Sequence, residues 1–204
     1  MIWESLWLTL KLALTTTLLL FVIGTPLAYW LSATKSKTKP VLETLVSMPL
    51  ILPPTVLGFY LLIAFGQSSF LGKLLEDLFG FQLVFSFSGL VLASVIYSLP
   101  FMVHPIQSGF SSLPVHLKEA AYSLGKSKTT TFFKILLPNI KPALLTGIVL
   151  SFAHTIGEFG VVLMIGGNLP GETRVASIAI YQEVEALNYG NANTPVSYTH
   201  LTLP

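Results

Sequence analysis

The sequence contains no cysteine and few charged residues. Only 10% of its 204 residues are Asp, Glu, Lys or Arg, whereas soluble globular proteins contain about 25%. The absence of cysteine excludes disulfide bonds, thiolate metal ligands and a cysteine nucleophile. A soluble domain with so few charges could not cover its surface with polar groups, so the ordinary soluble classes are excluded as well.

The N-terminus also lacks the basic region of a secretory signal peptide. The chain starts Met1-Ile2-Trp3-Glu4, and the apolar run that follows is too long for a signal peptide. The net charge is only +2, and the lysines lie in small clusters between apolar stretches, so nothing favours nucleic-acid binding. The chain has instead 52% hydrophobic residues and a mean hydropathy of +0.74, which indicate an integral membrane protein.

Four apolar stretches are long enough to cross a bilayer, which takes about 20 residues as a helix. We predict an all-α bundle with spans at about residues 12–31, 41–66, 87–107 and 143–167. Pro53 and Pro54 remove two backbone donors within the second stretch and should bend or open it, and Gly58 should permit close helix approach. Such a break lines a pathway or is a simple packing kink, and the residues alone leave both alternatives open.

The connections between these stretches differ in charge. Lys35, Lys37 and Lys39 follow the first stretch, and five lysines between residues 118 and 141 follow the third. By the positive-inside rule these two connections are cytoplasmic, so the N-terminus lies outside. Residues 176–190 then form an external amphipathic segment.

The C-terminal residues do not continue this pattern. We expect residues 1–193 to form one membrane domain and residues 194–204 to be a non-native tail, with a short external tail as the alternative. Four spans that start outside also end outside, so we expect the native chain to add about 20 apolar residues as a final span.

Glu158 and His154 lie four residues apart in the fourth stretch and therefore share one helix face. A charged carboxylate near the membrane centre costs about 2.5–3.5 kcal/mol on insertion scales, so Glu158 should face protein or water. We expect Glu158 to form an interhelical hydrogen bond, and its functional role would be a gate or a structural ion contact. A direct anion-binding site is disfavoured, because a carboxylate repels an anion. The alternatives are an intramembrane enzyme or a zinc site that uses these residues with His104, but neither has a recognisable ligand or nucleophile spacing.

The connection at residues 113–141 is the most informative segment. Pro114 suits the first turn of a helix and Gly125 suits the left-handed residue after its end. Between them we expect a short helix on which Ala120 and Ala121 let another backbone approach closely. A second short helix, at about residues 127–136, should be stopped by Pro138. A helix-turn-helix between two spans is suited to docking into the groove of a partner.

Three groups of residues here carry a resemblance to a known family: Glu119-Ala120-Ala121, Gly125, and Ile135-Leu136-Leu137-Pro138. Their spacing resembles the EAA loop of permease subunits in binding-protein-dependent ABC importers. In that family the loop forms a coupling helix that sits in a cleft of a cytoplasmic ATPase. The resemblance implies ATPase coupling by Glu119, Ala120, Ala121, Gly125, Ile135, Leu137 and Pro138.

A phosphate-binding loop is absent from this connection. Gly125-Lys126-Ser127 matches the end of such a loop, but Ala120 occupies the position of its required first glycine. ATP must therefore be hydrolysed by another chain.

Residues 48–59, 151–160 and 168–174 resemble the molybdate permease branch of the same family. The resemblance implies pathway or gate roles for Pro53, Pro54, Thr55, Gly58, Gly157 and Glu158. It also implies contacts with a binding protein for Asn168, Gly171, Glu172 and Arg174. The position of His154 is usually arginine in the family, so a fixed cation is replaced here by a group whose charge depends on pH.

The resemblance as a whole implies the permease subunit of an ATP-driven molybdate importer in the cytoplasmic (inner) membrane of a prokaryote. Sulfate and tungstate are the alternative substrates, and the external Pro-Gly-Glu-Thr-Arg run favours molybdate. The implied partners are a second permease copy, two copies of an ATPase subunit, an extracytoplasmic oxyanion-binding protein and the lipid bilayer. No cofactor, metal or catalytic residue is implied.

Overall fold

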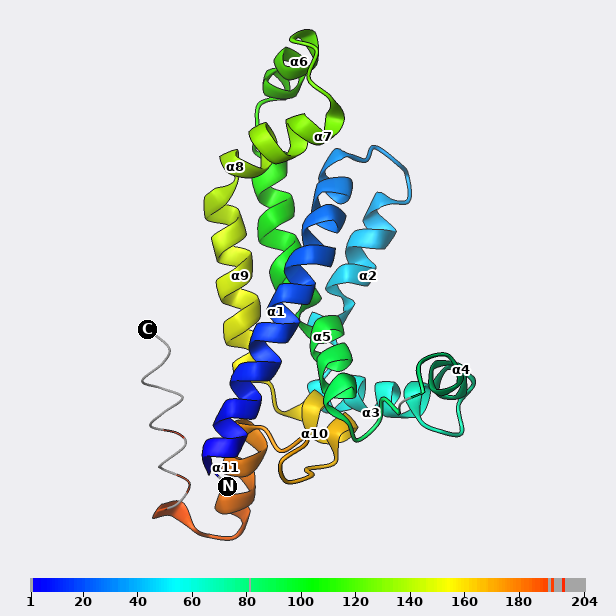
Figure 1. Cartoon of the computed structure of the whole chain (residues 1–204), viewed down its shortest axis with the longest axis vertical. Coiled ribbons are helices and arrows are strands. Elements are labelled where there is room, and N and C mark those ends of the chain that lie inside the picture. Colours follow the sequence, from blue (N-terminus) through cyan, green and yellow to red (C-terminus); the bar gives the residue numbers. More distant parts are fainter. Residues whose placement is uncertain (1, 81, 191, 193–195, 197–204) are drawn as a thin grey trace.

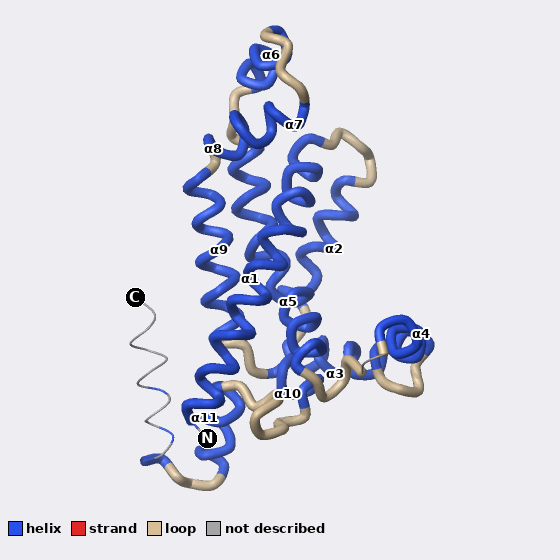
Figure 2. The backbone as a smooth tube through the Cα atoms, in the orientation of Figure 1, coloured by secondary structure: helices blue, strands red, loops and turns tan. Residues whose placement is uncertain are grey.

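The computed structural model describes residues 2–80, 82–190, 192 and 196. The helices of the first half are α1 (Ile2–Ala33), α2 (Lys39–Ile51), α3 (Pro54–Phe65), α4 (Phe70–Phe79) and α5 (Phe87–Ser111). Those of the second half are α6 (Val115–Ser123), α7 (Lys128–Thr131), the π-helix η1 (Phe132–Leu136), α8 (Leu137–Asn139), α9 (Lys141–Ile156), α10 (Gly160–Gly166) and α11 (Ala176–Glu185). The predicted all-α fold is confirmed for the described residues, which contain no strand (Figure 2). Apart from Val196, the expected tail at residues 194–204 lies outside the described residues.

Helices α1, α5 and α9 pack against one another and form the centre of the bundle (Figure 1). The described residues form two apolar clusters, one at each end of α5. One contains Leu12, Leu90 and Ile165, and the other contains Leu20, Met102 and Ile106. At 32 residues, α1 is about 48 Å long, which exceeds the hydrocarbon thickness of a bilayer.

Two helical segments, Trp3–Ala33 and Phe87–Ser111, are long and apolar enough to cross a membrane singly. Two further crossings qualify only as bent pairs: Lys39–Ile51 with Pro54–Phe65, and Lys128–Asn139 with Lys141–Ile156. The first pair is bent by 110° at Leu52 and Pro53, as expected from two prolines that lack backbone donors. The stretch 41–66 is therefore a broken helix whose second half turns away from the first.

The stretch 143–167 also differs from the single span that we expected. Helix α9 ends at Ile156, and α10 begins at Gly160 after a break in which Phe159 has φ −127° and ψ −64°. Close packing explains the turn, because α10 lies against α3 where glycines leave room. A Cβ atom on Gly160 would lie 2.9 Å from the Pro54 Cβ, and one on Gly58 would lie 2.8 Å from the Met164 Cβ. The close approach expected at Gly58 is thus present.

The two ends of the bundle carry different structures. Helices α6 and α7 form one end, whereas α4, α10 and α11 lie at the opposite end (Figure 1). The chain therefore places the segments 113–141 and 168–174, which sequence analysis singled out, on opposite sides of the molecule.

Candidate functional site

A cavity of about 420 Å³ lies where the two helix breaks meet. Its lining comes from the start of α3, from α5, from the end of α9 and from the break before α10. Four of the six predicted pathway residues are among the described lining residues: Pro54, Thr55, Gly157 and Glu158. Of the other two, Pro53 caps α3 beside the cavity, and Gly58 lies one turn further along α3 against α10.

Glu158 is buried at this cavity, with 4% of its surface exposed. The interhelical hydrogen bond that we expected from its carboxyl group is not formed among the described residues, since both carboxyl oxygens lack a partner. Glu158 itself lies in the break after α9, and so does not share a helix face with His154 as we expected. Its backbone joins the break to α11, since the Ser177 hydroxyl donates to the Glu158 carbonyl oxygen at 2.6 Å. Ser94 and Tyr97 of α5 approach the carboxyl group, so it faces protein, as the cost of a charge in lipid requires.

His154 lines the same cavity and is held by α5. Its Nδ1 atom lies 2.8 Å from the Ser98 hydroxyl, which in turn lies 3.1 Å from the Thr155 hydroxyl. Its ring stacks on Phe101 at 4.1 Å and contacts Tyr97 at 4.7 Å. Sequence reasoning missed Tyr97 and Ser98, because no spacing signal relates residues of α5 to a histidine more than fifty positions later. Among the described residues no three His, Asp or Glu side chains come together as a metal site.

His104 of α5 lies against α2. Its Nε2 atom lies 3.0 Å from the Ser47 hydroxyl. Nearby, the Gln107 amide donates to Glu43, which also lies 3.8 Å from the Lys39 ammonium. This polar cluster joins the bent second crossing to α5 at the end of the bundle that carries α6.

The turn after α6 has the geometry that its glycine predicted. Gly125 has φ +72°, its N–H donates to Tyr122 O at 2.9 Å, and the N–H of Lys126 donates to Ala121 O at 3.0 Å. These two bonds form a Schellman motif, which requires the left-handed residue. The expected surface of two alanines is only half correct, because Ala120 is exposed whereas Ala121 is 3% exposed and faces inward.

Pro138 does not stop the second helix, contrary to our expectation. The helical segment continues to Asn139 and ends at Ile140, and α9 begins at Lys141 with Pro142 in its first turn. The π-helix at Phe132–Leu136 explains the difference: its wider turn pairs the N–H of Leu137 with Phe132 O, just before the proline that lacks a donor. Ile135 and Leu137 are half-buried, and Leu136 is buried. Leu136 and Leu137 pack in the apolar cluster of the bundle.

An aromatic cluster fastens this loop to the bundle. The ring of Tyr29 on α1 lies 5.1 Å from Phe110 on α5 and 4.9 Å from Phe132 in η1. Leu117 of α6 and Leu136 join the same apolar cluster. The loop is therefore continuous with the core formed by α1 and α5, a connection that sequence reasoning did not find.

The segment 168–174 at the opposite end is a tight, internally bonded loop. The Thr173 hydroxyl donates to Gly166 O at 2.6 Å and accepts from the N–H of Leu169 at 2.9 Å. Arg174 Nε donates to the side chain of Asn168 at 2.7 Å, so this pair shapes the loop. Gly171 and Glu172 are exposed at its tip. The four predicted contact residues therefore divide into one internal pair and one exposed pair.

Comparison with known proteins identifies the family of this chain. Residues 10–198 match the family described as binding-protein-dependent transport system inner membrane component. The chain belongs to this family. It is therefore a multi-pass inner-membrane permease subunit that works with an ATPase and a substrate-binding protein, and it is not an enzyme. The intramembrane enzyme that used Glu158 and His154 was the wrong alternative.

Individual relatives share most of the permease's length. It is 48% identical over 186 residues to the molybdenum transport system permease protein ModB of Azotobacter vinelandii, which covers 91% of this chain and 82% of the relative. It is 36% identical over 183 residues to the protein of the same name in Escherichia coli K12, covering 90% and 80%. The probable sulfate transport system permease protein cysT of Chlorella vulgaris is 38% identical over 186 residues, covering 91% and 70%.

Proposed function

We propose that this permease carries molybdate into the cell, driven by ATP hydrolysis on a partner subunit. The observation that carries the proposal is the 48% identity over 91% of the chain to a permease named for molybdenum transport. The sulfate permease relative is 38% identical over the same share, which favours molybdate over sulfate. Tungstate is an oxyanion of the same class and remains the second candidate substrate.

The coupling step is assigned to the loop at residues 113–141. Glu119 and Ala120 are exposed on α6, and Gly125 sets the direction of the chain after it. Ile135, Leu137 and Pro138 belong to the helical segment that fastens the loop to the bundle, and Ala121 packs inside the loop. Closure of the ATPase would displace α6, and the aromatic cluster of Tyr29, Phe110 and Phe132 would pass the displacement to α1 and α5.

The pathway is assigned to the cavity where the helix breaks meet. Broken helices leave backbone carbonyl groups without helical hydrogen bonds. These groups need other polar partners or water, so broken helices are suited to line a route through the membrane. Two permease copies with their cavities facing each other would complete the pathway, and each copy would bind one ATPase subunit. Pro53, Pro54, Thr55, Gly157 and Glu158 would then form the gate.

The orientation follows from charge. The two lysine-rich connections, after α1 and after α5, lie at the end of the bundle that carries α6 (Figure 1). By the positive-inside rule this end is cytoplasmic, so the N-terminus is outside. The loop at residues 168–174 then faces the binding protein. Its tip, Gly171 and Glu172, would make direct contact, while Asn168 and Arg174 hold the loop in shape.

Reconstitution of the permease with its ATPase and its binding protein in proteoliposomes tests the proposal. We expect molybdate uptake that requires ATP, and ATP hydrolysis stimulated more by the molybdate-loaded binding protein than by the sulfate-loaded one. If only the sulfate-loaded binding protein stimulated ATP hydrolysis, sulfate and not molybdate would be the transported anion. Uptake that proceeds without the ATPase would contradict the coupling assignment.

A further inference from the structure

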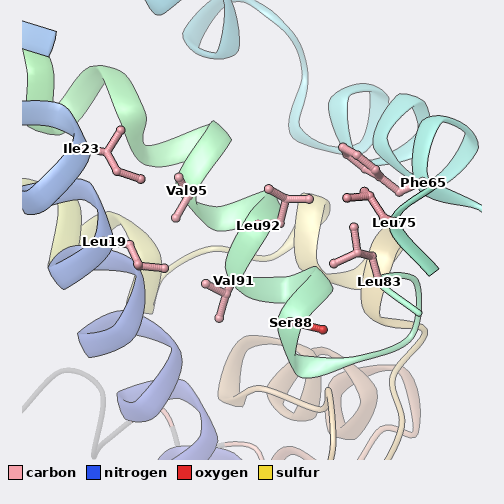
Figure 3. Close-up of a pocket in the computed structure, with 9 residues that line it drawn as sticks. All are labelled: Leu19, Ile23, Phe65, Leu75, Leu83, Ser88, Val91, Leu92 and Val95. Carbon is pink, nitrogen blue, oxygen red and sulfur yellow. The ribbon is translucent and has the colours of Figure 1, made fainter. Parts of the chain in front are cut away.

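An apolar groove of about 400 Å³ runs along α5 at the end of the bundle away from α6. Figure 3 shows α5 between two walls, with Leu19 and Ile23 of α1 on one side and Leu75 and Leu83 on the other. Leu19 and Ile23 are 38% and 53% exposed, so the groove is open to its surroundings. Because α1 and α5 are long enough to cross the membrane, these surroundings are hydrocarbon.

A cationic group and a hydroxyl pair lie at one end of this groove. Ser88, the polar member of its described lining, is in the first turn of α5, and its hydroxyl lies 2.8 Å from that of Ser86. The adjacent Phe87 ring lies 4.6 Å from the Lys11 ammonium. Lys11 is exposed and forms no ion pair within the described part of the chain. It lies eight residues before Leu19 on α1, which corresponds to about 12 Å along the helix.

Helix α4 places this end of the groove at the membrane surface. It lies beside the bundle (Figure 1) and is amphipathic. Leu71, Leu74 and Leu78 are 46%, 42% and 67% exposed on one face, and Lys73, Glu76 and Asp77 lie on the other. An amphipathic helix of this kind lies in the boundary between headgroups and acyl chains. Leu75 of the same helix lines the groove, so the groove opens just beneath that boundary.

We propose that the groove binds an anionic phospholipid of the leaflet on the α4 side. One acyl chain fills the groove, and the phosphate group lies at the Lys11 ammonium. The Ser86 hydroxyl caps α5 and donates to Leu83 O at 2.8 Å, so of the two hydroxyls only that of Ser88 can turn its proton toward the phosphate. Bulk lipid tails are as apolar as the groove, so its apolar lining alone gives no preference for one lipid over another. The preference comes from the headgroup. One lysine near an anionic headgroup accounts for a preference of about fivefold. This proposal is independent of the transported substrate.

Site-directed fluorescence in nanodiscs tests the lipid site. The chain has no cysteine, so a single thiol can be labelled selectively. Val22 is 61% exposed on α1 next to Ile23 without lining the groove, and Leu145 is 62% exposed on α9 as a reference position. Val22→Cys and Leu145→Cys are each labelled with a fluorophore, in the complex with the ATPase. Quenching is then measured with phosphatidylglycerol or phosphatidylcholine brominated on the acyl chains.

We expect the ratio of quenching by phosphatidylglycerol to quenching by phosphatidylcholine to be about fivefold higher at position 22 than at position 145. Lys11→Gln should abolish this difference, whereas Lys73→Gln removes the same charge from α4 and should leave it unchanged. Equal ratios at the two positions, or a ratio insensitive to Lys11→Gln, would overturn the proposal. Weak quenching by both lipids at position 22 would also overturn it, because a second protein copy would then cover the groove.

Discussion

Replacing Gly125 with alanine tests the coupling role that we propose for residues 113–141 without changing their packing. A Cβ atom on Gly125 would meet no other atom within 4 Å, so the cost of the substitution is confined to the backbone at φ +72°. An L-residue with a Cβ pays about 1–2 kcal/mol in the left-handed region. This corresponds to a factor of about 5–30 in the ratio of native to non-native turns. The hydrogen bonds of Lys126 and Gly125 to the end of α6 are lost in the same equilibrium, so α6 is presented in the wrong direction.

Gly80 provides a matched control. It caps α4 with φ +69°, and its Cβ position is equally open, so Gly80→Ala carries the same backbone penalty at the opposite end of the molecule. We expect Gly125→Ala to lower binding-protein-stimulated ATP hydrolysis by about fivefold or more, and Gly80→Ala to leave it near the wild-type value. Gly125→Asn should recover part of the activity, because asparagine tolerates the left-handed region. Wild-type stimulation in Gly125→Ala, or an equal loss in Gly80→Ala, would refute the reasoning.

Three further predictions concern the pathway and the orientation. Gly160→Ala would place a methyl group 2.9 Å from a side-chain atom of α3 and should cost about 1–3 kcal/mol. Gly157→Ala meets nothing nearer than 3.8 Å, so only the first variant should lower Tm, and equal Tm values would contradict the packing argument. Glu158→Gln should fold at least as stably as the wild type, since burying a neutral amide costs less than burying a carboxylate; a Tm lower by several degrees would show that the carboxylate has a stabilising partner. A thiol at Leu169→Cys should react with an impermeant reagent in intact cells and one at Lys126→Cys only after the membrane is opened, and the reverse pattern would invert the orientation.

Much of the fold was predictable because membrane helices obey strong local rules. A segment in lipid must satisfy its own backbone hydrogen bonds, so apolar length alone predicted the helices that became α1 and α5. The break at Leu52 and Pro53 follows from two prolines without donors, and the left-handed Gly125 follows from the absence of a Cβ. These features depend on a few consecutive residues, so they were accessible from the sequence.

The sequence by itself therefore determined the membrane class, the positions of the long helices and the turn chemistry at Gly125. Only the tertiary structure decided that α9 ends at Ile156 and that α10 turns to pack on α3, because the room left by Gly58 and Gly160 is a property of two segments together. It also decided that Pro138 is accommodated by a π-turn and that Glu158 lacks a hydrogen-bond partner among the described residues. Packing between distant segments selects among local alternatives of similar free energy, and a sequence read along one dimension does not contain those contacts explicitly.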